Sequence, residues 1–205
     1  MKIAILAASG KAGRAALNEA LNQGFEVSAF VRKQSQIDSR AKQIIKDIFK
    51  LSFEDLQAYD CIIDAFGEWE DLSLHLKHIQ HLHSILQNNS AKLLVVGGAG
   101  SLFLEDKTCL MDSADFPKEY LGVARATAEV LDFLRDKRDI NWLYFSPAAE
   151  FYEGARTGKF KLIGENFELN SKNQSRISYA DYATALLDLA KDESAKFKRV
   201  SIIEL

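Results

Sequence analysis

The turn after the first apolar run of the chain contains glycines at a spacing suited to phosphate binding. Its residues are Ala7, Ala8, Ser9, Gly10, Lys11, Ala12 and Gly13. A phosphate group can rest on the N-terminus of a helix only where the backbone comes close to it, which requires glycine or very small side chains. Gly10 and Gly13 meet this requirement, although the same pair also suits an ordinary strand-to-helix turn. We predict a dinucleotide site whose phosphates contact Ala8, Ser9, Gly10, Lys11, Ala12 and Gly13.

An arginine stands where the second predicted strand ends. In nucleotide-binding sheets an acidic residue at this place accepts hydrogen bonds from the ribose 2′-hydroxyl, whereas a guanidinium pairs with a 2′-phosphate. Arg32, followed by Lys33, therefore favours NADP(H), with NAD(H) as the alternative cofactor. The competing interpretation is a solvated Arg-Lys pair that binds no ligand.

Small or polar residues follow the later strands of the pattern as well. In an open parallel sheet, ligands bind beyond the carboxyl ends of the strands. We expect an aspartate late in the third strand to accept a hydrogen bond from the adenine amino group, and the glycines after the fifth strand to face the nicotinamide. The residues concerned are Asp47, Ala65, Phe66, Gly67, Gly97 and Gly98. An exposed aspartate and a flexible glycine turn would give the same pattern.

Alternating strands and helices must position these residues. The predicted strands are 2–7, 26–31, 44–49, 61–66, 92–96 and 141–145, and the predicted helices are 12–24, 53–58, 71–87 and 118–135. Parallel strands need crossover connections, and strands that are apolar on both faces must be covered on both sides. The sequence therefore predicts an α/β fold with a Rossmann-type, doubly wound parallel sheet.

The pattern loosens after residue 150. It predicts strands at 159–162 and 167–169, a helix at 179–190 and a closing strand at 200–203. We find no internal repeat and no linker. We expect one domain over residues 1–205, with a nucleotide-binding core of about 1–147 and a small C-terminal lobe of about 148–205.

Composition excludes several classes of partner. The chain has 26 lysines and arginines against 29 aspartates and glutamates, a net charge of −3, so we expect no nucleic acid and no membrane surface as partner. A hydrophobic content of 47% with low net charge is typical of a folded core. Cys61 and Cys109 show neither disulfide nor zinc spacing, which favours a cytoplasmic protein.

Four histidines lie within one predicted helix, namely His75, His78, His81 and His83. Three of them recur at intervals that could place them on one face. No glutamate or cysteine accompanies them at a recognised metal-ligand spacing. We predict no metal site and a helix edge that faces solvent.

Several motifs give the chain a family resemblance. They are the Ala-Ser-Gly-x-x-Gly turn, Val31-Arg32-Lys33, Gly97-Gly98-Ala99-Gly100-Ser101, residues 142–158 (WLYFSPAAEFYEGARTG) and residues 175–183 (SRISYADYA). The chain resembles the NADH-flavin reductase group of atypical short-chain dehydrogenase/reductases, which are NmrA-like Rossmann proteins related to biliverdin-IXβ reductase. The resemblance implies NAD(P)H binding, a C-terminal lobe over the nicotinamide with Pro147 crossing that end, and a flavin-like or quinone-like acceptor.

Two positions depart from the wider superfamily. The first glycine of the usual turn is Ala7, whose extra methyl crowds the turn. A Tyr-x-x-x-Lys pair normally gives a proton to a carbonyl, but Tyr120 is followed four residues later by Ala124. We therefore expect Tyr120 to be a packed or surface tyrosine, and both carbonyl reduction and sugar-nucleotide epimerisation are disfavoured. The catalytic residues stay unassigned.

A flavin or quinone needs less from the protein, because it is already an electron sink and solvent can supply the proton. The leading hypothesis is an NAD(P)H-dependent reductase, and the alternative is a non-catalytic NADP-binding redox sensor. Candidate aromatic walls for the acceptor are Phe66, Trp69, Phe103, Phe151 and Tyr152, and an ordinary core or surface aromatic is the favoured alternative for each. Arg156 and Arg176 could each meet an anionic acceptor or pair with Glu150, Glu153 or Asp181. A monomer and a homodimer both agree with the sequence.

Overall fold

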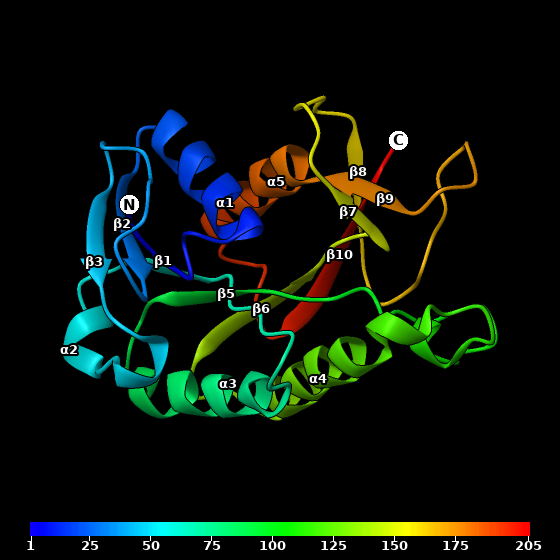
Figure 1. The fold of residues 1–205 in the computed structure, drawn as a ribbon, viewed down its shortest axis with the longest axis horizontal. Coiled ribbons are helices and arrows are strands. Elements are labelled where there is room, and N and C mark those ends of the chain that lie inside the picture. The colour runs from blue at the N-terminus through cyan, green and yellow to red at the C-terminus, as the bar shows by residue number, and fades with distance from the viewer.

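A computed structural model describes residues 1–205 and contains an eight-stranded central sheet (Figure 1). The strand order is β3-β2-β1-β4-β5-β6-β10-β8. The strands are β1 Lys2–Leu6, β2 Glu26–Val31, β3 Lys42–Ile45, β4 Cys61–Asp64, β5 Lys92–Val96, β6 Asn141–Ser146, β8 Phe160–Ile163 and β10 Lys198–Glu204. Every neighbouring pair is parallel except β10 and β8. The predicted doubly wound parallel sheet is confirmed, with one antiparallel strand at its edge.

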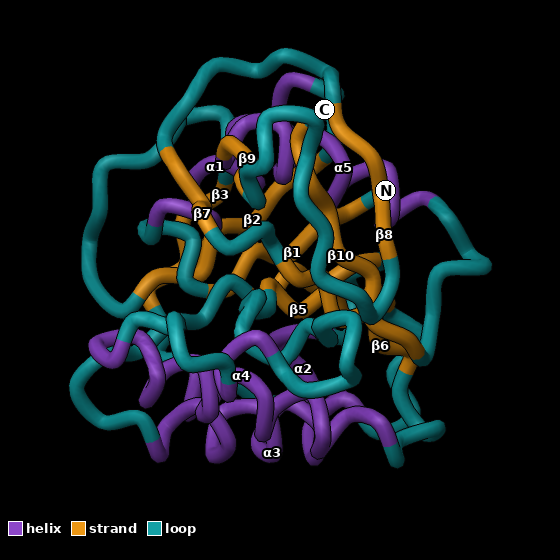
Figure 2. The backbone as a smooth tube through the Cα atoms, turned by 90° about the vertical axis from the view of Figure 1, so that its right-hand side faces the viewer, coloured by secondary structure: helices purple, strands orange, loops and turns teal.

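Five α-helices cover the two faces of this sheet. They are α1 Lys11–Asn22, α2 Phe53–Leu56, α3 Ser73–Leu86, α4 Lys118–Arg135 and α5 Tyr179–Lys191. Helices α1 and α5 pack together on one face, and α3 and α4 pack together on the other (Figure 1). Figure 2 shows many of the connecting loops in teal on the side that faces the viewer, in front of the strands.

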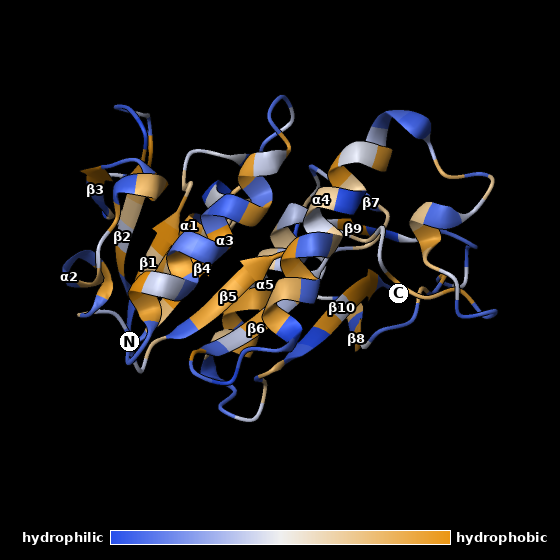
Figure 3. Cartoon of the chain, turned by 90° about the horizontal axis from the view of Figure 1, so that it is seen from below, coloured by the Kyte–Doolittle hydropathy of each residue, from blue (hydrophilic) through white to orange (hydrophobic).

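Each face of the sheet buries its own apolar cluster. Along β1, Ile3 and Ile5 belong to the cluster beneath α1 and α5, whereas Ala4 and Leu6 belong to the cluster beneath α3 and α4. Successive residues of a strand point to opposite faces, so a strand buried on both sides must be apolar throughout. Figure 3 shows this difference, since the central strands are largely orange while the helices mix apolar and polar residues.

The predicted third strand is wrong at its end. It stops at Ile45, and the residues that follow form a 3₁₀ turn, η1 Ile48–Lys50. Asp47 causes this change, because its carboxylate accepts a hydrogen bond of 2.9 Å from the Phe49 N–H and caps the turn. Asp47 therefore lies in the connection after β3 rather than within the strand.

Two further differences concern the C-terminal residues. The predicted strand at 167–169 does not form, since the Phe167 N–H makes a single hydrogen bond, to the Phe103 carbonyl. A separate two-stranded parallel sheet joins β7 Glu150–Tyr152 to β9 Arg176–Ser178 and was not predicted. Strands of three residues are too short to show a recognisable period in the sequence.

None of the helices combines the length and the apolar composition that a bilayer crossing requires. Both cysteines are free thiols, as the sequence predicts. Burial raises the pKa of Cys61 to about 12, so this thiol stays protonated and unreactive.

Candidate functional site

The glycine turn presents unpaired backbone N–H groups at the carboxyl end of β1. Gly10 is the N-cap residue of α1, and no side chain caps this helix. The N–H groups of Lys11, Ala12 and Gly13 find no acceptor within the protein. The first N–H groups of a helix carry partial positive charge and attract anions. This turn can therefore receive a phosphate.

Close packing explains the second glycine of the turn. A Cβ on Gly13 would lie 2.5 Å from the Ala7 carbonyl oxygen and 2.9 Å from the Ala8 Cα. Both are backbone atoms, so a larger residue would push α1 away from β1. A Cβ on Gly10 would lie 3.4 Å from the same oxygen, which is an ordinary contact. Gly13 is thus needed for packing, while Gly10 leaves space beside the free N–H groups.

Ala7 adopts a backbone φ of +54°. Left-handed backbone destabilises a residue with a Cβ by roughly 1–2 kcal/mol, whereas glycine adopts it freely. The turn nevertheless closes, because the Gly10 N–H donates to the Ala7 carbonyl at 3.0 Å. The chain therefore keeps the geometry of the glycine turn and stores strain at its first position.

Two side chains with free polar atoms follow strands β2 and β3, at the same carboxyl edge of the sheet as this turn. Arg32 follows β2 and is exposed, with no carboxylate within ion-pair distance. Asp47 follows β3 and is half-buried, and it uses one carboxylate oxygen to cap η1. The other oxygen has no partner. This arrangement can pair a phosphate with the guanidinium and accept a hydrogen bond from an amino group.

A buried aspartate fixes the loop that contains Ala65, Phe66 and Gly67. Asp64 ends β4 and is 1% exposed; it accepts a hydrogen bond of 3.1 Å from the Phe66 N–H. Its other oxygen is 2.9 Å from Nε2 of His78 on α3, and the Phe66 ring stacks on that imidazole with centroids 4.2 Å apart. Both the backbone and the ring of Phe66 are therefore held. This role of Asp64 was not predicted, although a carboxylate that ends an apolar strand is a usable signal in the sequence.

The prediction of solvent-facing histidines is wrong for two of the four. His75 and His78 are 3% and 2% exposed and face the sheet, while His81 and His83 are half-buried. A buried polar ring needs a partner, and Asp64 supplies one to His78. Burial also lowers the pKa of His75. No group of three histidine, cysteine or acidic side chains is placed to hold a metal ion.

The glycines after β5 are required by packing. A Cβ on Gly97 would lie 2.1 Å from the Tyr144 ring, and a Cβ on Gly98 would lie 2.7 Å from Oγ1 of Thr127 on α4. The Tyr144 hydroxyl accepts from the Gly98 N–H at 3.1 Å and donates to the Thr127 carbonyl at 2.9 Å. Pro147, directly after β6, is buried. These contacts fix the turn at the carboxyl end of β5.

A buried arginine anchors the far end of that turn. The Arg199 guanidinium on β10 donates to the Ser101 hydroxyl at 2.8 Å and to its carbonyl at 3.0 Å, and it pairs with Glu165. Glu165 also pairs with Arg135 of α4 at 2.7 Å. Burial acts to raise the pKa of Glu165, but the two arginines outweigh it and the pKa lies below its usual value. This network was not predicted, and its signal in the sequence is an arginine at the start of the closing apolar strand.

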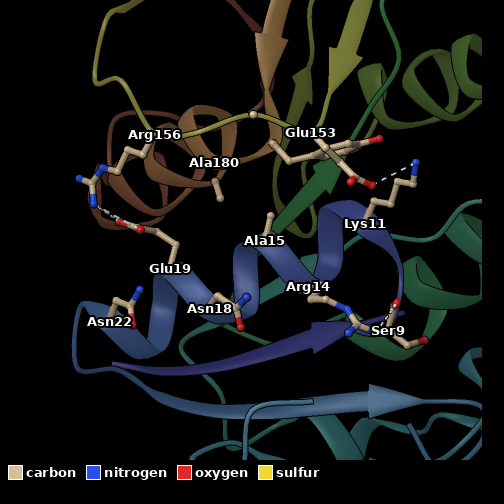
Figure 4. Close-up of a pocket in the computed structure, with 13 residues that line it drawn as sticks. Ser9, Lys11, Arg14, Ala15, Asn18, Glu19, Asn22, Glu153, Arg156 and Ala180 are labelled. Carbon is tan, nitrogen blue, oxygen red and sulfur yellow. Dashed lines mark hydrogen bonds and ion pairs between the residues drawn. The ribbon is translucent and has the colours of Figure 1, made fainter. Parts of the chain in front are cut away.

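A cavity lies beside the glycine turn rather than over it. It has a volume of about 690 Å³ and is bounded by α1, the segment 153–156 and the start of α5. Figure 4 shows Arg156 reaching Glu19 and Lys11 reaching Glu153, each pair 3.3 Å apart. Of the predicted cofactor contacts, only Ser9 and Lys11 line it. Charged and amide side chains stand in its wall beside Tyr179 and three alanines, so the cavity offers both polar and apolar surface.

The predicted aromatic walls are dispersed over the molecule. Phe151 packs against tyrosines of α5, the Tyr152 hydroxyl donates to a carboxylate of β10, and Phe103 lies under the Arg199 guanidinium. Phe66 is half-buried in the loop after β4. Trp69, in the same loop, is 65% exposed.

The two arginines considered for an anionic acceptor are both paired. Arg156 binds Glu19 at 3.3 Å. Arg176 lies 3.6 Å from Glu150 and 3.8 Å from Glu204. Arg176 thus pairs with Glu150, as one interpretation of the sequence expects, whereas the partner of Arg156 is Glu19, which was not among the expected carboxylates.

The sequence matches a family model described as NAD(P)H-binding over residues 7–193. The matched range contains the glycine turn, Arg32 and the turn after β5.

Several relatives cover the whole chain. The Bacillus subtilis protein YwnB, which is uncharacterized, is 43% identical over 99% of this chain and 98% of its own length. A solved structure from Streptococcus pneumoniae, named a "putative NADH-flavin reductase", is 42% identical and covers 100% of both chains with a TM-score of 0.95. A Bacteroides thetaiotaomicron structure named a "putative epimerase" is 34% identical, covers 100% of this chain and 97% of its own, and has a TM-score of 0.90.

Proposed function

The chain belongs to the NAD(P)H-binding family, and from this membership we propose that it is an NADPH-preferring reductase that passes hydride to a flavin-like or quinone-like acceptor. The observation that carries the cofactor preference is Arg32, an exposed guanidinium after the end of β2 that forms no ion pair within the protein, although, besides backbone hydrogen bonds, its charge helps to lower the pKa of Glu68. The name of the Streptococcus pneumoniae relative supports the acceptor class.

The residues present fit a dinucleotide. The pyrophosphate would rest on the free N–H groups of the first turn of α1, the 2′-phosphate would pair with Arg32, and the adenine amino group would donate to Asp47. Lys11 pairs with Glu153, but these side chains are 69% and 74% exposed. Exposed pairs of this kind contribute little, so Lys11 is free to turn to a phosphate.

The chain's own contribution to the reaction is orientation. Bound NADPH supplies a hydride, which together with one proton from solvent reduces a flavin or a quinone by two electrons. The turn after β5, held by Tyr144 and Arg199, and the buried Pro147 would fix the nicotinamide ring so that one face meets the acceptor. No protein acid is needed for this transfer.

The residue that replaces the usual lysine favours a flavin-like or quinone-like acceptor. Ala124 is buried and packs against Gly100, so no ammonium stands one turn of α4 beyond the Tyr120 phenol. Carbonyl reduction and sugar-nucleotide epimerisation both use that pair to move a proton. This disfavours epimerase chemistry for this chain, whatever the Bacteroides thetaiotaomicron relative does. The same feature leaves a second candidate, a redox sensor that binds NADP and makes no product.

Calorimetric titration with NADPH and NADH tests the cofactor preference. A charge-assisted hydrogen bond contributes about 1.5–3 kcal/mol, so Arg32→Ala should weaken NADPH binding roughly 10- to 150-fold and leave NADH binding nearly unchanged. Lys33→Ala is the matched control, because it removes the adjacent exposed cation and should change NADPH binding little. Equal losses of both nucleotides in Arg32→Ala would exclude a 2′-phosphate contact.

Turnover separates the two candidate functions. The protein is mixed with NADPH and with riboflavin, FMN or menadione, and the loss of the near-ultraviolet absorbance of NADPH is followed. Oxidation with any of these acceptors supports the reductase. Tight NADPH binding without oxidation by any of them favours the sensor.

A further inference from the structure

An exposed pair of aromatic rings lies beyond the carboxyl ends of the central strands. Trp69 and Tyr120 are 65% and 49% exposed, and their rings meet edge to face with centroids 6.2 Å apart. Trp69 comes from the loop after β4 and Tyr120 from the first turn of α4. The other tryptophan, Trp142, is 1% exposed in the core. Adjoining exposed aromatic rings mark a binding surface more often than single scattered ones do.

The pair stands beside the turn after β5. Ala124 of α4 packs against Gly100, since a Cβ on that glycine would lie 2.7 Å from the Ala124 Cβ. Helix α4 runs from the carboxyl ends of the strands back towards the start of β6. Tyr120 therefore lies one helical turn, about 5.4 Å, beyond Ala124 in the direction away from the sheet's carboxyl edge. A Cβ on Gly122 would lie 2.8 Å from Leu72, so the loop that carries the tryptophan is packed on the same turn of α4.

Acidic residues lie next to the tryptophan in the chain. Its neighbours in the chain include Glu68, Glu70 and Asp71. The N–H groups of Glu70 and Trp69 donate to the Glu68 carboxylate at 2.9 and 2.8 Å and lower the pKa of Glu68, which stays ionised. Next to Tyr120, one lysine and one glutamate offset each other. The Arg32 guanidinium also attracts the Glu68 carboxylate. Once Arg32 pairs with the 2′-phosphate of NADPH, the acidic residues are in excess here and would repel a phosphate-bearing acceptor but not an uncharged one.

We propose that Trp69 and Tyr120 form the acceptor subsite, on which an uncharged planar redox molecule such as riboflavin or a simple quinone stacks beside the nicotinamide. This inference rests on the proposed reductase function and narrows its substrate class. Aromatic faces suit such an acceptor because flat rings prefer offset-stacked or edge-to-face contacts. The cavity beside α1 is lined by one aromatic ring, that of Tyr179, and therefore offers no pair of adjoining rings.

Equilibrium dialysis tests the subsite without turnover. Riboflavin and menadione are dialysed against the full chain saturated with NADP⁺, using the wild type, Trp69→Leu, Tyr120→Leu and a control, Leu162→Ala, which changes an exposed apolar residue of β8. Both aromatic substitutions should weaken acceptor binding about tenfold or more. NADPH affinity, measured by calorimetry, should stay within about twofold in every variant, which shows that each one folds. Unchanged acceptor affinity in both aromatic variants would overturn the proposal.

Selection against a phosphate-bearing acceptor can be tested separately. The wild type should bind riboflavin more tightly than FMN. This difference in affinity should become smaller at high salt, because salt screens the charges, and it should also be smaller in Glu70→Gln at low salt. A preference for FMN would overturn the proposed selection against phosphate. If the wild type neither binds nor reduces any acceptor, the reductase function itself fails. If it turns over while Trp69→Leu keeps the wild-type KM for the acceptor, only the subsite fails.

Discussion

Replacing Ala7 with glycine should stabilise the protein, although it removes a methyl group. Ala7 has a φ of +54°, where a residue with a Cβ is destabilised by roughly 1–2 kcal/mol. Glycine avoids this strain but leaves the unfolded chain more conformational freedom, which costs about 0.4–1 kcal/mol. The difference predicts a gain of about 0.5–1 kcal/mol in the free energy of unfolding.

Urea denaturation of Ala7→Gly and of a matched variant, Ala12→Gly, measures this gain. Ala12 lies in the first turn of α1, with ordinary helical backbone. Glycine in a helix is destabilising by roughly 0.5–1 kcal/mol relative to alanine. The same substitution on the two sides of Gly10 should therefore move the unfolding midpoint in opposite directions.

A loss of stability in Ala7→Gly as large as that in Ala12→Gly would refute the assignment of strain to Ala7. The slope of the unfolding free energy against urea should stay constant, because a changed slope would locate the effect in the denatured state. NADPH affinity should not fall in Ala7→Gly, since glycine preserves the turn and its hydrogen bond from the Gly10 N–H.

Two further predictions concern packing and pH. Gly13→Ala should lower the free energy of unfolding by about 1–3 kcal/mol, because the new Cβ would lie 2.5 Å from the Ala7 carbonyl oxygen. Urea denaturation measures this loss, and an equally large loss in Gly10→Ala would contradict the explanation. Glu165→Gln should be less stable than the wild type at neutral pH. Burial alone would raise the pKa of Glu165, but its arginine partners hold that pKa below its usual value. The ionised carboxylate therefore stabilises the folded protein above the unfolded pKa of about 4.3, and this contribution is lost as the pH falls through the folded pKa. Denaturation from neutral pH down to about pH 3 should show the gap closing, and a constant gap would contradict the argument.

Local signals in the sequence were sufficient for most elements. Glu26–Val31, Lys92–Val96 and Lys118–Arg135 have the predicted bounds, because a buried apolar run, or a proline before an amphipathic stretch, is visible within the element itself. The prediction failed where an interaction reached outside the element. The strand predicted at 167–169, for example, had no partner strand to pair with.

The sequence by itself determined the glycine turn and Arg32, because a strand end, a turn and a helix N-terminus are neighbours along the chain. The tertiary structure alone decided that Asp64 is buried against His78, that Arg199 holds the turn after β5, and that Trp69 and Tyr120 form one surface. The physical reason is that a polar or aromatic side chain is buried or exposed according to partners that fold next to it, and these partners lie far away in the sequence.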